Sequence, residues 1–375
     1  MFPQICTRPR SCPAGLDLRL GQSLAQPTSV KPMPVSPHSQ IVDDLDALEA
    51  GEWSSPLLRR LLDTGGESQA ELFQRARDVR QRRGVDRVTL RGVIELSNHC
   101  QKSCDYCAMR SPNGDLSRYR MDAATVLTIA EQLVQHRIPI LFLQAGQDPQ
   151  SDAIVEEVIP WIKANTQLKV LLCLGERPRA AYERFRALGA DSYILKFESS
   201  DADLYRSITR TSLDRRLQCL RDLQELGYEV GTGSIVGLPG QNKDHLVQDM
   251  LQALRSKPDF VSASPFIPNP TTPFEAAPSG DLQQTLKMLA IYRVALGTPL
   301  IPNVSALEKL QAGGQRLGLM AGANVTTVNF TPTDFRAKFN IYSNERFVVS
   351  LQHALDTIAS AGLQRLEPDM HARIA

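Results

Sequence analysis

The sequence has no excess of charge of one sign. Its 375 residues include 42 lysines and arginines against 41 aspartates and glutamates, which gives a formal net charge of +1. Proteins that bind nucleic acids gather basic residues into a patch or stripe, because the phosphate backbone dominates that binding. No such stripe is visible, so we expect no nucleic-acid partner.

Long apolar runs are also missing. No stretch of the sequence approaches the roughly 18 apolar residues of a membrane-spanning helix. The start of the chain lacks the apolar core of a secretory leader. We therefore expect no membrane association and a cytoplasmic location.

Cysteines are few and unevenly placed. There are seven, an odd number, and none follows Cys219. Three of them fall within one short segment, residues 100–107. A disulfide framework is typical of an even number of spread cysteines in an oxidising compartment. We therefore expect a reducing compartment and a metal site.

The first 40 residues differ in composition from the rest. They are rich in proline and contain a single acidic residue, Asp17. Such a segment buries too little apolar surface to offset its loss of entropy on folding, which predicts a disordered tail. Its acid-poor composition with Arg and Ser also fits an organellar transit peptide, and this alternative stays open.

Helices are predicted next, over residues 41–85, followed by alternating strands and helices over 86–342. Leu72, Phe73, Ala76 and Val79 share one helical face. The eight candidate strands are Val88–Ser97, Ile138–Gly146, Lys169–Gly175, Ser192–Glu198, Glu229–Gly237, Phe260–Ile267, Thr298–Ser305 and Ala323–Phe330. Apolar strands separated by amphipathic helices indicate parallel βαβ units, and eight of them predict an α/β fold, a (β/α)8 barrel. A last helix, Arg346–Ala361, and a tail complete residues 343–375.

The segment Cys100-Gln101-Lys102-Ser103-Cys104-Asp105-Tyr106-Cys107 follows the first predicted strand, where a barrel places a functional loop. Three thiolates on a short loop can ligate three irons of a 4Fe–4S cluster and leave the fourth iron without a protein ligand. The alternatives are a zinc site completed by His99 and a chance group of buried thiols. The sequence shows no second pair of zinc ligands nearby, so we favour the cluster.

The C-x3-C-x2-C spacing, with Tyr106 before the last cysteine, resembles the signature of the radical S-adenosylmethionine (SAM) enzymes. The resemblance implies that SAM chelates the open iron and is cleaved by one electron to a 5′-deoxyadenosyl radical. It also implies that Tyr106 lies against the adenine of SAM, and we favour this over the alternative of simple packing within the loop.

The rest of the barrel is similar to the HydE group, which includes hydrogenase maturases, methylornithine synthase and biotin synthase. The similar segments are 119–121, 143–149, 174–176, 233–241, 265–273 and 322–332. The resemblance implies that the methionine ammonium of SAM meets Gln144, Ala145, Gly146 and Gln147.

Further SAM contacts are implied by the same resemblance. Glu198 matches a carboxylate that contacts SAM, and Arg216 matches an arginine that pairs with the methionine carboxylate. Cys173 replaces a serine found near the cofactor, and Glu176 lies at the mouth of the third strand. The alternatives are a salt bridge at the rim for Glu176 and Glu198, and a solvated helix face for Arg216.

Some positions depart from the HydE pattern. Gln147 replaces an acidic residue, so one charge toward the ammonium is lost. Gly231 stands where biotin synthase has a cluster cysteine, which disfavours sulfur insertion. The segment from Ser305 to Lys309 replaces a threonine-rich stretch at the substrate end. The cofactors are therefore implied more directly than the substrate.

We expect a radical SAM enzyme that acts on a small molecule and takes electrons from a reductant such as ferredoxin or flavodoxin. The resemblance implies maturation of the [FeFe]-hydrogenase cluster. An enzyme similar to methylornithine synthase, or another radical SAM enzyme acting on an amino-acid-like molecule, is the alternative. A hypothesis from another class is a non-catalytic iron–sulfur or zinc scaffold.

Overall fold

The computed structural model describes residues 37–341 and 346–368. The predicted disordered tail, residues 1–40, lies outside the described residues except for its last four, which begin the first helix. The end of the C-terminal tail, residues 369–375, also lies outside them.

Three helices precede the sheet: α1 (Pro37–Ala50), α2 (Ser55–Asp63) and α3 (Gly66–Arg82). Helix α2 begins after Ser54 because the Ser54 side chain accepts a hydrogen bond from the backbone N–H of Leu57. Leu72, Ala76 and Val79 of α3 are buried, as the sequence pattern predicts. This face packs against α10 (Leu282–Leu296).

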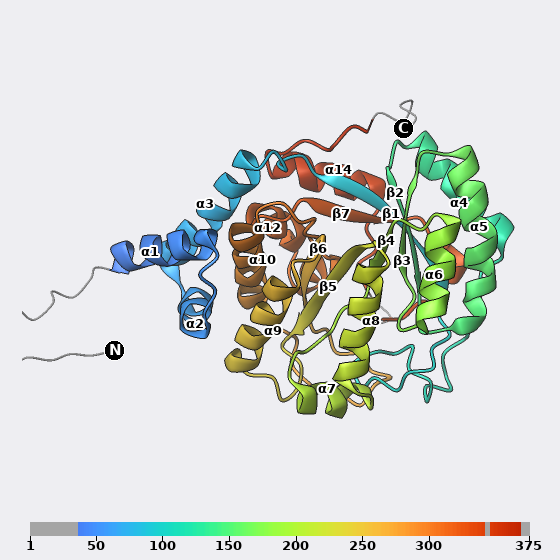
Figure 1. Cartoon of the computed structure of the whole chain (residues 1–375), viewed down its shortest axis with the longest axis horizontal. Coiled ribbons are helices and arrows are strands. Elements are labelled where there is room, and N and C mark those ends of the chain that lie inside the picture. Colours follow the sequence, from blue (N-terminus) through green and yellow to red (C-terminus); the bar gives the residue numbers. More distant parts are fainter. Residues whose placement is uncertain (1–36, 342–345, 369–375) are drawn as a thin grey trace, which may run out of the picture. The chain divides into compact units, whose positions relative to one another are not determined.

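The described residues form one sheet of seven parallel strands in the order β6-β5-β4-β3-β2-β1-β7 (Figure 1). The strands are β1 (Thr89–Ser97), β2 (Ile140–Ala145), β3 (Lys169–Cys173), β4 (Ser192–Ile194), β5 (Glu229–Val236), β6 (Phe260–Pro265) and β7 (Val325–Asn329). Strands that follow each other in the sequence lie side by side in the sheet from β1 to β6, and β7 lies beside β1. This order is that of a TIM-type α/β barrel. The predicted fold class is confirmed.

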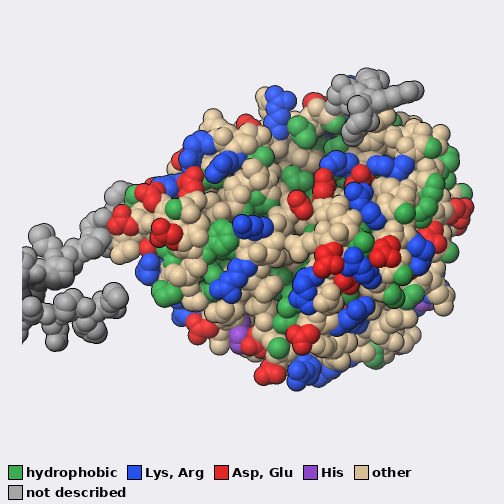
Figure 2. Space-filling model, in the orientation of Figure 1, with side chains coloured by type: hydrophobic (Ala, Val, Ile, Leu, Met, Phe, Trp, Pro, Cys, Tyr) green, Lys and Arg blue, Asp and Glu red, His purple; other side chains and the backbone are tan. Residues whose placement is uncertain are grey.

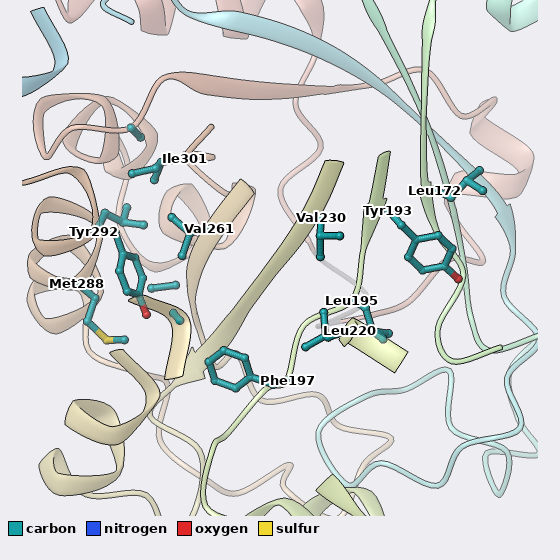
Figure 3. Close-up of a cluster of buried hydrophobic side chains, with 14 of the residues drawn as sticks. Leu172, Tyr193, Leu195, Phe197, Leu220, Val230, Val261, Met288, Tyr292 and Ile301 are labelled. Atoms are coloured by element: carbon teal, nitrogen blue, oxygen red, sulfur yellow. The ribbon is translucent and has the colours of Figure 1, made fainter. Parts of the chain in front are cut away.

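Helices cover the outer face of the sheet (Figure 1). They are α4 (Ala123–Gln135), α5 (Asp152–Asn165), α6 (Arg179–Leu188), α8 (Leu213–Glu225), α9 (Lys243–Ser256), α10, α12 (Gly314–Met320) and α14 (Leu351–Ser360). The connections also contain α7 (Ala202–Thr209), α11 (Ser305–Leu310), α13 (Thr333–Arg336) and a 3-10 turn, η1 (Pro149–Ser151), before α5. Figure 3 shows the core between the two layers, where Met288 and Tyr292 of α10 point toward Val261 of β6. Apolar burial of this kind is the main stabilising contribution to the fold.

The eighth predicted strand, Thr298–Ser305, does not form in the described residues. The segment makes only single bridges, from Leu300 to Phe260 and from Pro302 to Val325, on the edge strands β6 and β7. Pro299 and Pro302 explain the difference, because proline has no N–H to donate to a strand ladder. The segment therefore fills the seam between the two edges without extending the sheet.

The C-terminal helix, α14, is shorter than the sequence predicts. The last helix was predicted over Arg346–Ala361 but begins later, at Leu351, where Ser350 accepts a hydrogen bond from the N–H of His353. No helix in the described residues is long and apolar enough to cross a membrane. On the face drawn in Figure 2, basic and acidic side chains lie intermixed.

Candidate cofactor site at the carboxyl ends of the strands

The three cysteines of the 100–107 loop line one cavity of about 200 Å³ at the carboxyl ends of the strands. Cys104 is buried, and Cys100 and Cys107 are half-buried. The loop follows β1 and lies beside α7 at the lower edge of Figure 1, and Asp105 N–H donates to the carbonyl of Ile208 in α7 (2.8 Å). The fold thus carries the three thiols to the mouth of the barrel.

One arginine organises the backbone of this loop. The Arg118 guanidinium donates to the carbonyls of Asn98 (2.6 Å), Met109 (2.8 Å), Arg110 (2.8 Å) and Asn113 (3.1 Å). Four bonds from one rigid fork hold the two ends of the loop together. This role of Arg118 has no local signal in the sequence, because its bonds are to backbone carbonyls that only the folded loop brings together.

Gly146, at the end of β2, permits a close approach between that strand and the cysteine loop. A Cβ atom at this position would lie 2.1 Å from the carbonyl oxygen of His99 and 2.9 Å from Cβ of Cys100. The next residue, Gln147, donates its backbone N–H to Sγ of Cys100 (3.3 Å), and Gln101 N–H donates to the carbonyl of Gln147 (2.9 Å). The absence of a side chain at Gly146 therefore sets the position of Cys100.

Burial raises the pKa of the Cys104 thiol to about 11 and the pKa of Cys107 well above its ordinary value. The neighbouring cysteines add to the rise in the pKa of both thiols, and all three cysteines line the same cavity. Yet in the described residues no three His, Cys, Asp or Glu side chains are grouped as a single metal ion requires. A cubane needs a different arrangement, since each thiolate binds its own iron. The donor set fits a 4Fe–4S cluster.

Glu198 faces the same cavity from the segment after β4. Its backbone lies in the left-handed region, with φ of 62°, which is uncommon for a residue with a side chain. Its buried Oε2 has no hydrogen-bond partner among the described residues and lies 3.6 Å from Nζ of Lys196. A strained residue with an unsatisfied carboxylate oxygen fits a ligand with a positive or hydrogen-bonding group.

A buried carboxylate behind Glu198 fixes this turn. Asp249 of α9 accepts hydrogen bonds from the N–H (2.6 Å) and hydroxyl (2.7 Å) of Ser200, and from the amide of Gln241 (3.1 Å). Gln241 in turn accepts from the N–H of Gly237 (2.6 Å), at the end of β5. Burial raises the pKa of Asp249 to about 7. The segments after β4 and β5 are thus joined through one side chain.

Glu176 bridges two cations at the rim of the cavity. Its carboxylate lies 3.0 Å from Nζ of Lys102, in the cysteine loop, and 2.9 Å from Nε of Arg216, in α8. Burial opposes the charge of Arg216, but Tyr205 and Glu176 raise the pKa of its guanidinium above the ordinary value. Arg216 is therefore a buried, charged group whose orientation is set by Glu176.

The structure brings nearly all predicted site residues to one cavity. Its lining includes Cys100, Cys104, Tyr106, Cys107, Gln144, Ala145, Gln147, Cys173, Glu198 and Arg216. Gly146 and Glu176 do not line it, and they act on Cys100 and Arg216 as described above. Tyr106 packs against an apolar cluster that includes Ile235 and Phe266. The predicted alternative of a solvated helix face for Arg216 is wrong, because this side chain is buried.

A second cavity, of about 160 Å³, lies deeper inside the barrel, and we call it the inner chamber. It contains Arg91, Glu95 and Arg346 in its wall. Arg346 pairs with Glu95, with Nη2 2.6 Å from Oε2. Arg91 donates from Nε to the hydroxyl of Thr327 (2.6 Å) and lies over the ring of Phe142 at 4.8 Å. The chamber thus has a mainly apolar wall with a few charged groups, which suits a small molecule.

Comparison with known proteins agrees with this geometry. Residues 94–253 match the model of the radical SAM superfamily. The [FeFe] hydrogenase maturase subunit HydE of Thermotoga maritima is 38% identical over 301 residues, which are 80% of this chain and 86% of that protein. The chain belongs to the radical SAM superfamily. The 3-methylornithine synthase of Methanosarcina acetivorans is a more distant relative, 28% identical over 78% of this chain and 85% of its own.

The fold of a solved superfamily member is also similar. The crystal structure of methylornithine synthase (PylB) matches with a TM-score of 0.75 at 23% identity, covering 86% of this chain and 97% of that one. As a radical SAM enzyme, this protein binds a 4Fe–4S cluster and SAM, and cleaves SAM reductively. It therefore acts with a reductant on a small-molecule substrate.

Proposed function

We propose that Cys100, Cys104 and Cys107 hold the 4Fe–4S cluster, and that SAM occupies the cavity beside them. The observation that carries this proposal is the convergence on one cavity of three thiols and of Glu198, whose buried Oε2 has no hydrogen-bond partner among the described residues. The convergence joins a loop after β1 with the end of β4, about 95 residues later in the chain.

The side chains around the cavity match the groups of SAM. Arg216 is a buried cation suited to the methionine carboxylate. Gln144 and Gln147 offer amides to the ammonium, and Glu198 supplies a negative charge. Tyr106 gives an aromatic surface for the adenine. Because Gln147 is neutral, we expect Glu198 to provide the main charge toward the ammonium.

The bound cluster supplies the single electron that cleaves SAM to methionine and a 5′-deoxyadenosyl radical. The protein's task is to exclude water and to direct the radical. Ile235, Phe266 and Ile267 form an apolar wall of the cavity. The inner chamber adjoins the cavity through other residues, Gln144 and Cys173 among them, and we propose that the substrate binds there.

For the substrate, we propose the HydE activity, the processing of a small iron–cysteine complex during maturation of an [FeFe] hydrogenase. The identity of 38% to a HydE over most of both chains supports it. The second candidate is an amino-acid rearrangement like that of 3-methylornithine synthase. Ser305, where the threonine-rich stretch is replaced, lines the inner chamber, so the substrate end has changed. Ferredoxin or flavodoxin is the proposed reductant, and an oxygen-sensitive cluster supports a cytoplasmic location.

The first experiment tests the cofactor assignment. Anaerobically reconstituted protein should be brown and should form 5′-deoxyadenosine and methionine from SAM when reduced. The Cys104→Ala variant should lose the cluster absorption, whereas the control Cys219→Ala, whose thiol lies on α8 outside both cavities, should retain it. Full cluster loading in Cys104→Ala, or a loaded wild type that never forms 5′-deoxyadenosine, would contradict the proposal.

The second experiment separates the two substrates. The reduced enzyme is incubated with SAM and either the iron–cysteine carbonyl/cyanide complex or a panel of amino acids, and 5′-deoxyadenosine formation is measured. Stimulation by the complex alone supports the maturase activity. Stimulation by an amino acid alone supports the rearrangement.

A further inference from the structure

The two cavities of the barrel share part of their walls. Gln144, Cys173, Ile194, Lys196, Ser264 and Ile341 line both of them. Cys173 is the last residue of β3 and pairs in register with Gln144 of β2. A thiol therefore lies at the junction between the proposed SAM site and the inner chamber.

We infer that Cys173 is a catalytic thiol that donates a hydrogen atom to carbon radicals formed in these cavities. The inference rests on the proposed function, because reductive cleavage of SAM is the source of those radicals. It assigns to Cys173 a role in the chemistry beyond a polar contact with the cofactor.

An independent observation indicates that the inner chamber receives a ligand. Arg91 is 6% exposed, and its Nη1 has no hydrogen-bond partner among the described residues. The other arginine of the chamber, Arg346, is neutralised by Glu95. A buried cation without a counterion is costly. An anionic group of the substrate, such as a carboxylate, would satisfy Arg91. It would place the rest of the molecule near Cys173, because both side chains line the chamber, Arg91 over the ring of Phe142 and Cys173 against the apolar cluster that contains Phe142.

The surroundings of Cys173 keep it in the form that can donate a hydrogen atom. Its side chain packs against an apolar cluster that includes Val93, Phe142 and Leu171. Burial raises the pKa of this thiol to about 11, so the S–H bond is intact at neutral pH. An S–H bond is weaker than the primary C5′–H bond of 5′-deoxyadenosine. Transfer of its hydrogen atom to the 5′-deoxyadenosyl radical is therefore downhill.

The proposed step balances in atoms and electrons. The S–H bond of Cys173 breaks homolytically, a C–H bond forms on the carbon radical, and an unpaired electron remains on Sγ. One electron from the one-electron reductant of the enzyme and one proton from solvent restore the thiol. Because a thiol proton exchanges with solvent, the hydrogen delivered to the carbon carries the isotope of the water.

The test uses SAM alone as the probe, with cluster-loaded enzyme and dithionite in D2O. With no substrate present, the 5′-deoxyadenosyl radical itself takes the hydrogen atom of Cys173. Most of the 5′-deoxyadenosine from wild type should then carry one deuterium at C5′. The Cys173→Ser variant keeps a polar side chain of similar shape, but its O–H bond is too strong to donate, so its product should be largely unlabelled. Cys219→Ser should behave as wild type.

A protein-side measurement accompanies the isotope test. Turnover in the presence of a nitrone spin trap should attach the trap to the peptide that contains Cys173, only when SAM and reductant are both present. Labelled product from Cys173→Ser at the wild-type level, unlabelled product from wild type, or absence of the trapped peptide would overturn the inference and leave the proposed function standing. Complete absence of 5′-deoxyadenosine would overturn both.

Discussion

Replacing Glu176 by glutamine tests whether this residue organises the site without contacting the cofactor. The carboxylate pairs with Lys102 and Arg216, and the three side chains are only 8%, 11% and 9% exposed. Removing one partner of a buried ion pair costs about 3–5 kcal/mol, because the remaining charge is left uncompensated. Arg216 keeps its bond to Tyr205 and Lys102 keeps its bond to Thr211. We therefore expect the lower end of this range, about 3 kcal/mol.

The assay is denaturant unfolding of the cluster-free protein, followed by equilibrium binding of SAM to the reconstituted variant. The free energy of unfolding should fall by about 3 kcal/mol, and SAM should bind more weakly because Arg216 loses its support. The matched control is Glu225→Gln, whose carboxylate pairs with Arg179 at 2.5 Å but is 59% exposed, so its loss should cost less than about 1 kcal/mol. Equal small effects of both substitutions would refute the assignment of Glu176 as a buried support.

Three further changes address other parts of the site. Gly146→Ala should displace the cysteine loop, since the new Cβ would lie 2.1 Å from the His99 carbonyl oxygen. The iron content after reconstitution should therefore fall below that of wild type. A wild-type iron content would contradict the role of Gly146. Asp249→Asn should gain stability relative to wild type by roughly 2–3 kcal/mol as the pH rises from 5 to 8. The reason is that the raised pKa of Asp249, about 7, makes its ionisation in the folded state unfavourable. The same difference in unfolding free energy between variant and wild type at both pH values would contradict this prediction. Arg91→Met should stabilise the substrate-free protein by about 1 kcal/mol or more, since it removes a buried charge without a counterion. Calorimetry should show that the variant no longer binds acetate in the inner chamber. An acetate affinity equal to that of wild type would contradict the anion site.

The sequence predicts the sheet well because seven of the eight predicted strands are short apolar runs with clear ends. The eighth predicted strand is wrong for a reason already visible in the sequence, since Pro299 and Pro302 interrupt it. The cysteine loop is recognisable because its ligands are local in sequence. Arg118 and Arg91 were not predicted, because their roles depend on the folded backbone and on partners such as Thr327, which lies 236 residues from Arg91.

The seam between β6 and β7 has a consequence for the passage of substrate. Elsewhere in the sheet neighbouring strands pair directly with each other, but here the edges are linked through the extended segment, by amides such as those of Val261, Leu300 and Asn303. Pro302 and Ser305 from this seam also line the inner chamber. Local opening at this place breaks few hydrogen bonds, so its amides should exchange with solvent faster than those of β1 and β2. We therefore expect this seam to be the part of the chamber wall that opens most readily, and its opening would connect the inner chamber with the outer face of the sheet.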